Sequence, residues 1–329
     1  MTIRSSLIKL LRDLRSMSVM MKPRVTIGIC VRNCEDFIGE AINSVANQDF
    51  SHESMETIIV DDGSQDKTLS VISRYKSKMD MQVKIFRQEW KGLGSARNIV
   101  VDNASGEYII WVDGDMLLST DYVSKQVKFM EQNHKVGIAK GRYDLSPGAN
   151  LLATLEIYSR AASKMVNFNY NDKAHAKSMG TGGCIYRVKA IRQVGGFDEK
   201  ISGYGEDLDA EYRIRKAGWL FFITDAQFRD YERRGMTWKQ LWARYLQRGF
   251  DMCYFSRKNK NMITLYKTSP VATFFAGFFH SLKIYRLTRH KVAFLLPIQY
   301  MVKSTAWFLG FIRGRIIRLE GKETRQSDL

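Results

Sequence analysis

Short apolar runs alternate with helical segments along the first third of the chain. Four runs rich in β-branched residues predict strands, at 24–31, 56–60, 82–86 and 107–112. Three segments between them predict helices, at 35–47, 65–79 and 92–104. This alternation predicts an α/β fold with a Rossmann-like, mostly parallel sheet that carries helices on both faces. In such sheets ligands bind outside the carboxyl ends of the strands, so functional residues are expected there.

The segment before the first strand has a different pattern. Apolar residues recur at three- and four-residue steps, at Ile3, Leu7, Leu10, Leu11, Leu14 and Met17. Basic residues lie between them, so residues 1–23 are predicted to form a basic amphipathic helix. The segment lacks the continuous apolar stretch and cleavage site of a secretory signal, so no export is expected. The helix can either pack on the body or contact a membrane surface, and the pattern does not separate these alternatives.

The last hundred residues, 227–329, are both apolar and basic. Residues 270–282 are apolar but too short to span a bilayer, whereas 292–312 have spanning length and contain polar positions. Gln299 and Lys303 are four residues apart and therefore share one helical face. This stripe favours a helix lying in the plane of the membrane over a single span, which remains the alternative.

The charge distribution supports this division of the chain. The net charge is +17, but residues 25–226 carry 25 basic and 27 acidic residues, whereas 227–329 carry 20 basic and six acidic. A basic flank is attracted to an anionic membrane or to nucleic acid; the Phe and Leu beside its Arg favour the membrane, and no nucleic acid partner is expected. The four cysteines show no metal-binding spacing, which indicates reduced thiols in a cytosolic setting.

Acidic residues follow two of the predicted strands. The run 56–60 leads into Asp61-Asp62-Gly63-Ser64, and 107–112 leads into Asp113-Gly114-Asp115. The first strand is followed by no G-x-G-x-x-G and the chain has no P-loop sequence, which argues against a dinucleotide cofactor and P-loop chemistry. Two converging carboxylates separated by glycine suit Mg²⁺ or Mn²⁺, with substrate phosphates completing the coordination shell. Both stretches are also ordinary turn sequences; their position at strand ends favours function.

Five stretches in order carry a resemblance to a known family. They are VTIGICVRNCEDFIGEAINSV, IIVDDGSQDKT, KGLGSARN, ASGEYIIWVDGD and GGFDEKISGYGEDLDAEYRIRKAGW. Together they resemble a family 2 glycosyltransferase with the GT-A fold, over about residues 24–224. The resemblance implies a catalytic domain at 24–226, followed by membrane-associated helices.

The resemblance also implies roles for individual residues at the donor site. Asp62 matches the carboxylate that binds the nucleobase of a nucleoside-diphosphate sugar, and Asp61 lies beside it. Arg97 matches a segment that borders the donor. Asp113 and Asp115 match the D-x-D that binds the divalent ion, with Asp113 also at the donor nucleotide. Where the family often has Thr and Tyr this chain has Val31 and Arg32, so the nucleobase is not implied.

On the acceptor side, the resemblance assigns Asp207 as the general base of an inverting transfer, with Glu206 in support. The same acidic residues also fit a solvated helix with i,i+4 ion pairs, although the preceding glycines favour a site. The Q-x-x-R-W of processive members is absent after the catalytic domain, so addition of a single sugar is expected.

The expected activity is therefore metal-dependent transfer from a nucleotide sugar to a saccharide, most simply a lipid-linked saccharide, at the cytoplasmic membrane face. Transfer to a polyprenyl phosphate is an alternative. A non-enzymatic nucleic-acid binder that uses its basic C-terminal region is another.

Overall fold

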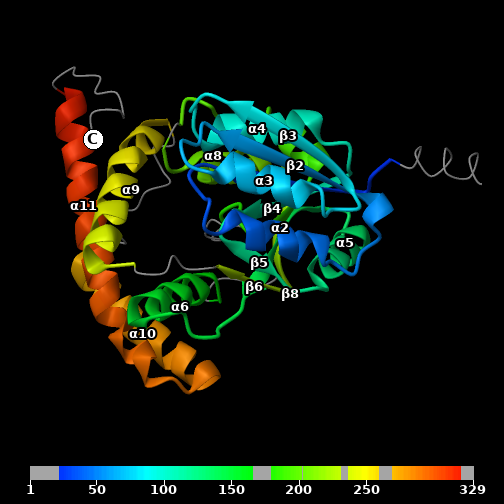
Figure 1. Ribbon diagram of the computed structural model, residues 1–329. Coiled ribbons are helices and arrows are strands. Elements are labelled where there is room, and N and C mark those ends of the chain that lie inside the picture. Colours follow the sequence, from blue (N-terminus) through cyan, green and yellow to red (C-terminus); the bar gives the residue numbers. More distant parts are fainter. Residues whose placement is uncertain (1–21, 166–178, 202, 231–235, 259–268, 320–329) are drawn as a thin grey trace, which may run out of the picture.

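The computed structural model describes residues 22–165, 179–201, 203–230, 236–258 and 269–319. The predicted helix at 1–23 falls almost entirely outside these ranges. The described strands form one sheet in the order β3-β2-β1-β4-β7-β6-β8-β5 (Figure 1). They are β1 (Val25–Val31), β2 (Met55–Asp62), β3 (Gln82–Gln88), β4 (Tyr108–Asp113), β5 (Met116–Leu118), β6 (Val136–Tyr143), β7 (Cys184–Arg187) and β8 (Leu220–Asp230).

Helices cover both faces of the sheet, as the sequence predicts. The described helices of this body are α2 (Ile38–Ala46), α3 (Thr68–Lys76), α4 (Leu93–Asn103), α5 (Tyr122–Gln132), α7 (Val188–Gln193) and α8 (Glu206–Lys216), with a short 3₁₀ turn η1 (His52–Ser54). The predicted strands correspond to β1–β4, which are parallel to their neighbours within that half. The first predicted helix, 35–47, begins later than expected, at Ile38.

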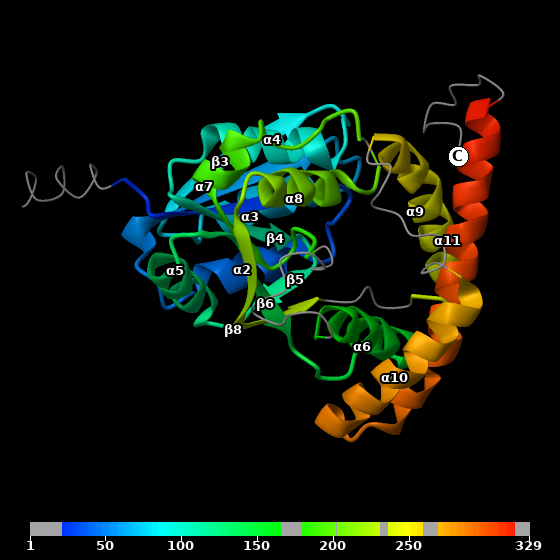
Figure 2. The ribbon, with the colours of Figure 1, turned by 180° about the vertical axis from the view of Figure 1, so that it is seen from behind.

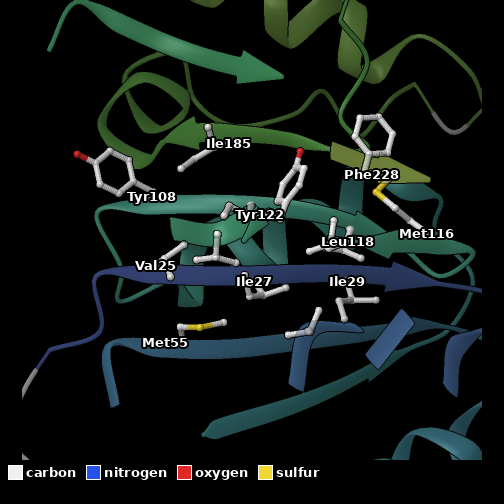
Figure 3. Packing of buried hydrophobic residues seen from close by; sticks show 14 of the residues in the cluster. Val25, Ile27, Ile29, Met55, Tyr108, Met116, Leu118, Tyr122, Ile185 and Phe228 are labelled. Atoms are coloured by element: carbon white, nitrogen blue, oxygen red, sulfur yellow. The ribbon is translucent and has the colours of Figure 1, made fainter. Parts of the chain in front are cut away.

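Alternating side chains of the central strands divide the core into two layers. Ile27 and Ile29 of β1 face a cluster that includes Tyr122 of α5 (Figure 3). Trp111 of β4 faces the opposite layer, where it packs beside α4 and α8. Because both faces are covered, the central strands are apolar along nearly their whole length. Polar groups on these strands are therefore confined mainly to their ends.

Four further helices form one side of the molecule (Figures 1 and 2). They are α6 (Leu151–Met165), α9 (Trp238–Lys258), α10 (Pro270–Thr288) and α11 (Leu296–Leu319), and a 3₁₀ turn η3 (Lys291–Leu295) precedes α11. In both views α6 lies between α10 and the sheet, whereas α11 forms the outer edge. The helix predicted at 292–312 is thus present as η3 and α11. Within the described residues, Lys291–Ile317 is the one helical stretch long and apolar enough to cross a membrane.

Glycines bring the backbones of α9 and α11 into contact. A Cβ atom built on Gly249 would lie 1.9 Å from the carbonyl oxygen of Trp307, and one on Gly310 would lie 1.9 Å from that of Leu246. Neither position has room for a side chain, so the two helices are held at a close, fixed approach.

The polar stripe of α11 is present but faces inward. Gln299 and Lys303 are buried, and both contact Glu156 of α6. Gln299 Nε2 donates to Glu156 Oε1 at 2.8 Å, and Lys303 Nζ also donates to the Ser159 hydroxyl at 2.6 Å. The sequence expectation placed this stripe at a membrane interface. It packs on α6 instead because the buried Glu156 carboxylate needs a cation and donors.

The glycine contacts predict a reversal of the usual effect of alanine in a helix. Glycine to alanine at an open helical position stabilises by about 1 kcal/mol. Gly310→Ala is expected instead to lower the free energy of unfolding by about 1–3 kcal/mol, because its methyl group would overlap the Leu246 carbonyl. Chemical denaturation of the full chain measures this, with Ala243→Ser on the exposed side of α9 as the control. A gain in stability for Gly310→Ala would contradict the close approach.

Candidate active site

The candidate acidic residues of β2 and β4 lie on either side of the end of β1. In the strand register, Val31 is opposite Asp61 and Cys30 is opposite Asp113. Burial raises the pKa of Cys30 to about 12; Arg97 opposes this shift, while Asp113 and Asp62 add to it. The two acidic stretches that the sequence singles out therefore meet at one edge of the sheet.

Asp62 is fully engaged by the connection between β3 and α4. Its Oδ1 accepts hydrogen bonds from Gln88 Nε2 at 2.7 Å and from the Lys91 amide at 2.9 Å. Its Oδ2 accepts one from the Gly92 amide at 3.0 Å. This carboxylate, which the family resemblance matches to the nucleobase, fixes the loop that leads into α4.

Asp61 differs from its neighbour in having an unused oxygen. Its side chain is fully buried, and Oδ1 accepts a hydrogen bond from the Ser64 amide at 3.1 Å. Oδ2 is buried and has no hydrogen-bond donor among the described residues; the Arg87 Nε lies 3.6 Å away as an ion-pair partner. A buried carboxylate oxygen without a donor is energetically costly, which marks it as a position for a ligand N–H or O–H.

The Asp113-Gly114-Asp115 turn connects β4 to β5 and requires its glycine. A Cβ on Gly114 would lie 2.6 Å from Val31 Cγ1, so the turn packs directly against the end of β1. A second glycine, Gly182, approaches from the other side, where a Cβ would lie 2.3 Å from Asp113 Oδ2. Burial raises the pKa of Asp113, with Arg97 opposing the shift and Asp230 adding to it.

The other candidates lie at the start of α8. Glu206 is buried and forms an ion pair with Arg97 of α4, and its Oε2 accepts a hydrogen bond from the Gly205 amide at 3.1 Å. Gly205 has a φ of 117°, a backbone conformation that favours glycine. Burial raises the pKa of Glu206; Arg97 opposes this shift and Asp207 adds to it.

Asp207 is half-buried and faces the segment 179–183. A Cβ on Gly180 would lie 3.4 Å from Asp207 Oδ2. Gly182, two residues later, is the glycine that meets Asp113. Arg97 is close enough to interact electrostatically with Asp113 and Asp207 as well as with Glu206. The segment 179–183 and Arg97 thus connect the D-x-D turn with the acidic start of α8.

Sequence reasoning missed two charged residues beside this cluster. Lys140 of β6 is buried, and its ammonium group donates to the carbonyl of Gly182. Asp230 ends β8, pairs with Arg160 of α6, and interacts electrostatically with Asp113. Asp230 could have been found from its position at the end of a strand, but β8 was not predicted from the sequence.

The residues present fit a divalent cation with an incomplete protein shell. Within the described parts of the chain, no group of three or more His, Cys, Asp or Glu side chains could hold a metal ion by itself. Asp113 and Asp115 would supply two carboxylates, and Mg²⁺ is commonly bound by one or two carboxylates together with substrate phosphates and water. Gly182, which has no side chain, lies directly against the Asp113 carboxylate.

Comparisons with known proteins identify similar chains. An uncharacterized glycosyltransferase of Haemophilus influenzae is 38% identical over 125 residues, which are 38% of this chain and 48% of that protein. The poly(ribitol-phosphate) beta-N-acetylglucosaminyltransferase TarS of Staphylococcus aureus is 32% identical over 102 residues, or 31% of this chain and 18% of that protein. The chain therefore matches less than half the length of these curated relatives.

A solved structure extends the likeness to the fold of almost the whole chain. The mannosyltransferase PcManGT from Pyrobaculum calidifontis, solved with GDP-Man and Mn²⁺, superposes with a TM-score of 0.60 at 18% identity, covering 92% of this chain and 89% of that one. The family model described as Glycosyl transferase family 2 matches residues 26–195. Because this match spans more than half of the chain and contains both strands that end at the candidate aspartates, the protein belongs to glycosyl transferase family 2.

Proposed function

We propose that the protein is an inverting glycosyltransferase that moves one sugar from a nucleoside-diphosphate sugar to a hydroxyl of a lipid-linked saccharide. The reaction would take place at the cytoplasmic face of the membrane. The observation that carries the proposal is the close approach of one glycine-containing segment, 179–183, to both Asp113 and Asp207. The carboxylate proposed for the donor diphosphate and the carboxylate proposed for the acceptor hydroxyl therefore border the same piece of backbone.

In this proposal Asp61, and not Asp62, accepts a hydrogen bond from the nucleobase. Both oxygens of Asp62 already accept hydrogen bonds from the protein, whereas Asp61 Oδ2 has no donor among the described residues. The Arg87 side chain beside it is well exposed, so it can move aside for a base. Asp62 then has a supporting role, since it holds the loop that borders the donor.

The donor diphosphate would lie at Asp113 and Asp115, which would hold Mg²⁺ or Mn²⁺. When bound, the cation would stabilise the negative charge that develops on the departing nucleoside diphosphate. Arg97 balances the charge of Glu206, Asp113 and Asp207 from within the protein. We therefore assign Arg97 to positioning these carboxylates, although the family resemblance placed it at the donor.

Asp207 would act as the general base. It lies in the first turn of α8, directly after Glu206. The ionised carboxylate can then take the proton of the acceptor hydroxyl as that oxygen attacks the sugar. Glu206 is paired with Arg97 and so fixes the start of the helix that carries Asp207.

The C-terminal helices connect this site with a membrane in the proposal. The loop before Asp207 packs on α9: a Cβ on Gly203 would lie 2.4 Å from Asp251 Cγ, and the Tyr204 amide donates to Asp251 Oδ2 at 3.2 Å. Since α9 also packs tightly on α11, the acceptor side of the site is attached to the apolar helices. This supports an acceptor that carries a lipid.

The first test distinguishes loss of the general base from loss of donor binding. Asp207→Asn is expected to bind the nucleotide sugar normally but to lower the transfer rate by ~10²–10⁴, because a neutral amide cannot take the proton. Donor binding is measured by calorimetry and transfer by product formation, with Asp225→Asn on the exposed part of β8 as the control. A polyprenyl phosphate acceptor is already ionised and needs no base, so unchanged turnover in Asp207→Asn would favour that alternative.

A paired substitution tests the assignment of the two neighbouring aspartates. Asp61→Asn can keep the hydrogen bond from the Ser64 amide but presents an NH₂ group in place of Oδ2, so nucleotide affinity is expected to fall at least about tenfold with little loss of stability. Asp62→Asn is expected to lower the free energy of unfolding by about 1–3 kcal/mol, because an amide cannot accept all three hydrogen bonds. Calorimetry and chemical denaturation of both variants measure the two effects. If Asp62→Asn lowers nucleotide affinity and Asp61→Asn lowers stability, Asp62 is the residue that binds the nucleobase.

The cation is tested at Asp115. Asp115→Ala is expected to remove most of the increase in nucleoside-diphosphate affinity that Mn²⁺ gives, on the order of tenfold or more, because one carboxylate ligand is lost. Titrations of the nucleoside diphosphate with Mn²⁺ and with EDTA, on the wild type and the variant, give this difference. Equal dependence on Mn²⁺ in both proteins would rule out Asp115 as a ligand.

A further inference from the structure

Large apolar side chains are exposed along one face of α10. Val271, Phe274, Phe275, Phe278, Phe279 and Leu282 follow the three- and four-residue steps of a single helical stripe. Phe275 is 60% exposed and Phe279 is 68% exposed. Apolar patches of this extent on a soluble body mark a surface that another partner covers.

The apolar stripe continues on α11. Ile298, Leu309 and Ile316 are exposed, whereas Gln299 and Lys303 of the same helix are bonded to Glu156 inside the protein. In the first half of α11 the sides are thus reversed relative to an ordinary surface helix, since Gln299 and Lys303 face the body and Ile298 faces outward. Moving α11 into a bilayer as a span would leave the buried Glu156 without its cation, which is strongly unfavourable.

The charge around the apolar stripes identifies the partner. Residues 270–319 contain eight Lys and Arg and no Asp or Glu. Arg286, Arg289 and Lys291 are exposed at the turn between the two helices, and Arg313 and Arg315 are exposed near the end of α11. An apolar face with a purely cationic rim is complementary to a lipid leaflet with anionic headgroups. A protein partner or nucleic acid would leave either the Phe side chains or the cations unmatched.

We infer that the outward faces of α10 and α11 form a docking surface that lies in the plane of an anionic lipid leaflet, with the Phe side chains among the acyl chains and the basic residues at the headgroups. This inference rests on the proposed function only for the lipid-linked acceptor; the docking surface itself follows from exposure and charge. Docking there would hold the start of α8, through α9 and α11, at a fixed height above the lipid surface.

The test is binding of the purified full chain to vesicles. Wild type is expected to float with vesicles that contain anionic phosphatidylglycerol and to bind neutral phosphatidylcholine vesicles far less. Phe275→Gln with Phe279→Gln is expected to weaken binding at least tenfold. Arg286→Gln, Arg289→Gln and Lys291→Gln together are expected to weaken it on the order of 100-fold, at about 1 kcal/mol for each charge.

Tyr212→Gln is the matched control, since this side chain is 37% exposed on α8 and outside the surface. It should bind vesicles as wild type does. Alkaline carbonate should release the wild type from vesicles, because in-plane helices are extractable and a spanning helix is not.

Any of these results would overturn the inference: equal binding to neutral vesicles, wild-type binding by the Phe variant, retention after carbonate, or a stable dimer in place of vesicle binding. Competition by duplex DNA for the same surface would overturn it as well. Calorimetry measures binding of the nucleotide sugar by the same variants, so that a failure of the docking surface can be distinguished from a failure of the proposed function. The Phe variant should bind the donor normally, so loss of donor binding would count against the proposed site and not against the docking surface.

Discussion

Concentrated negative charge at one edge of the sheet is the constraint on which the rest of this structure depends. The strands β2 and β4 end in aspartates, and α8 begins with Glu206 and Asp207 at the same edge. Such a gathering is unstable without compensation, and Arg97 supplies it from α4 through its ion pair with Glu206 and its proximity to Asp113 and Asp207. The fold therefore fixes the helices α4 and α8 to each other through the ion pair between Arg97 and Glu206.

Much of this arrangement was predictable, because ligands in such sheets bind at the carboxyl ends of the strands. The sequence located β1–β4, the three helices between them, and the edge at which Asp113 and Asp115 lie. It did so because hydrophobic runs and the residues after them are local properties of the chain. The position of Asp207 and Asp113 beside one segment, 179–183, could not be read in that way, since that segment is distant from both in sequence.

The roles proposed within the cluster also depend on contacts that no sequence pattern reveals. Asp61 and Asp62 are adjacent and equivalent in the sequence, and the family resemblance favours Asp62. Only the hydrogen bonds distinguish them, because the β3–α4 connection uses both oxygens of Asp62 and leaves Asp61 Oδ2 without a donor among the described residues. Similarly, the spacing of Gln299 and Lys303 correctly predicted a shared face, but which way that face points depended on Glu156 of a distant helix.

The buried charges of α6 join the outer helices to the sheet edge by an unbroken series of contacts. Lys303 of α11 pairs with Glu156, Arg160 Nη2 lies 3.7 Å from the same carboxylate, and Arg160 also pairs with Asp230 at the end of β8. Asp230 in turn interacts electrostatically with Asp113. A tilt of α11 relative to the body would therefore change the electric field at the D-x-D turn.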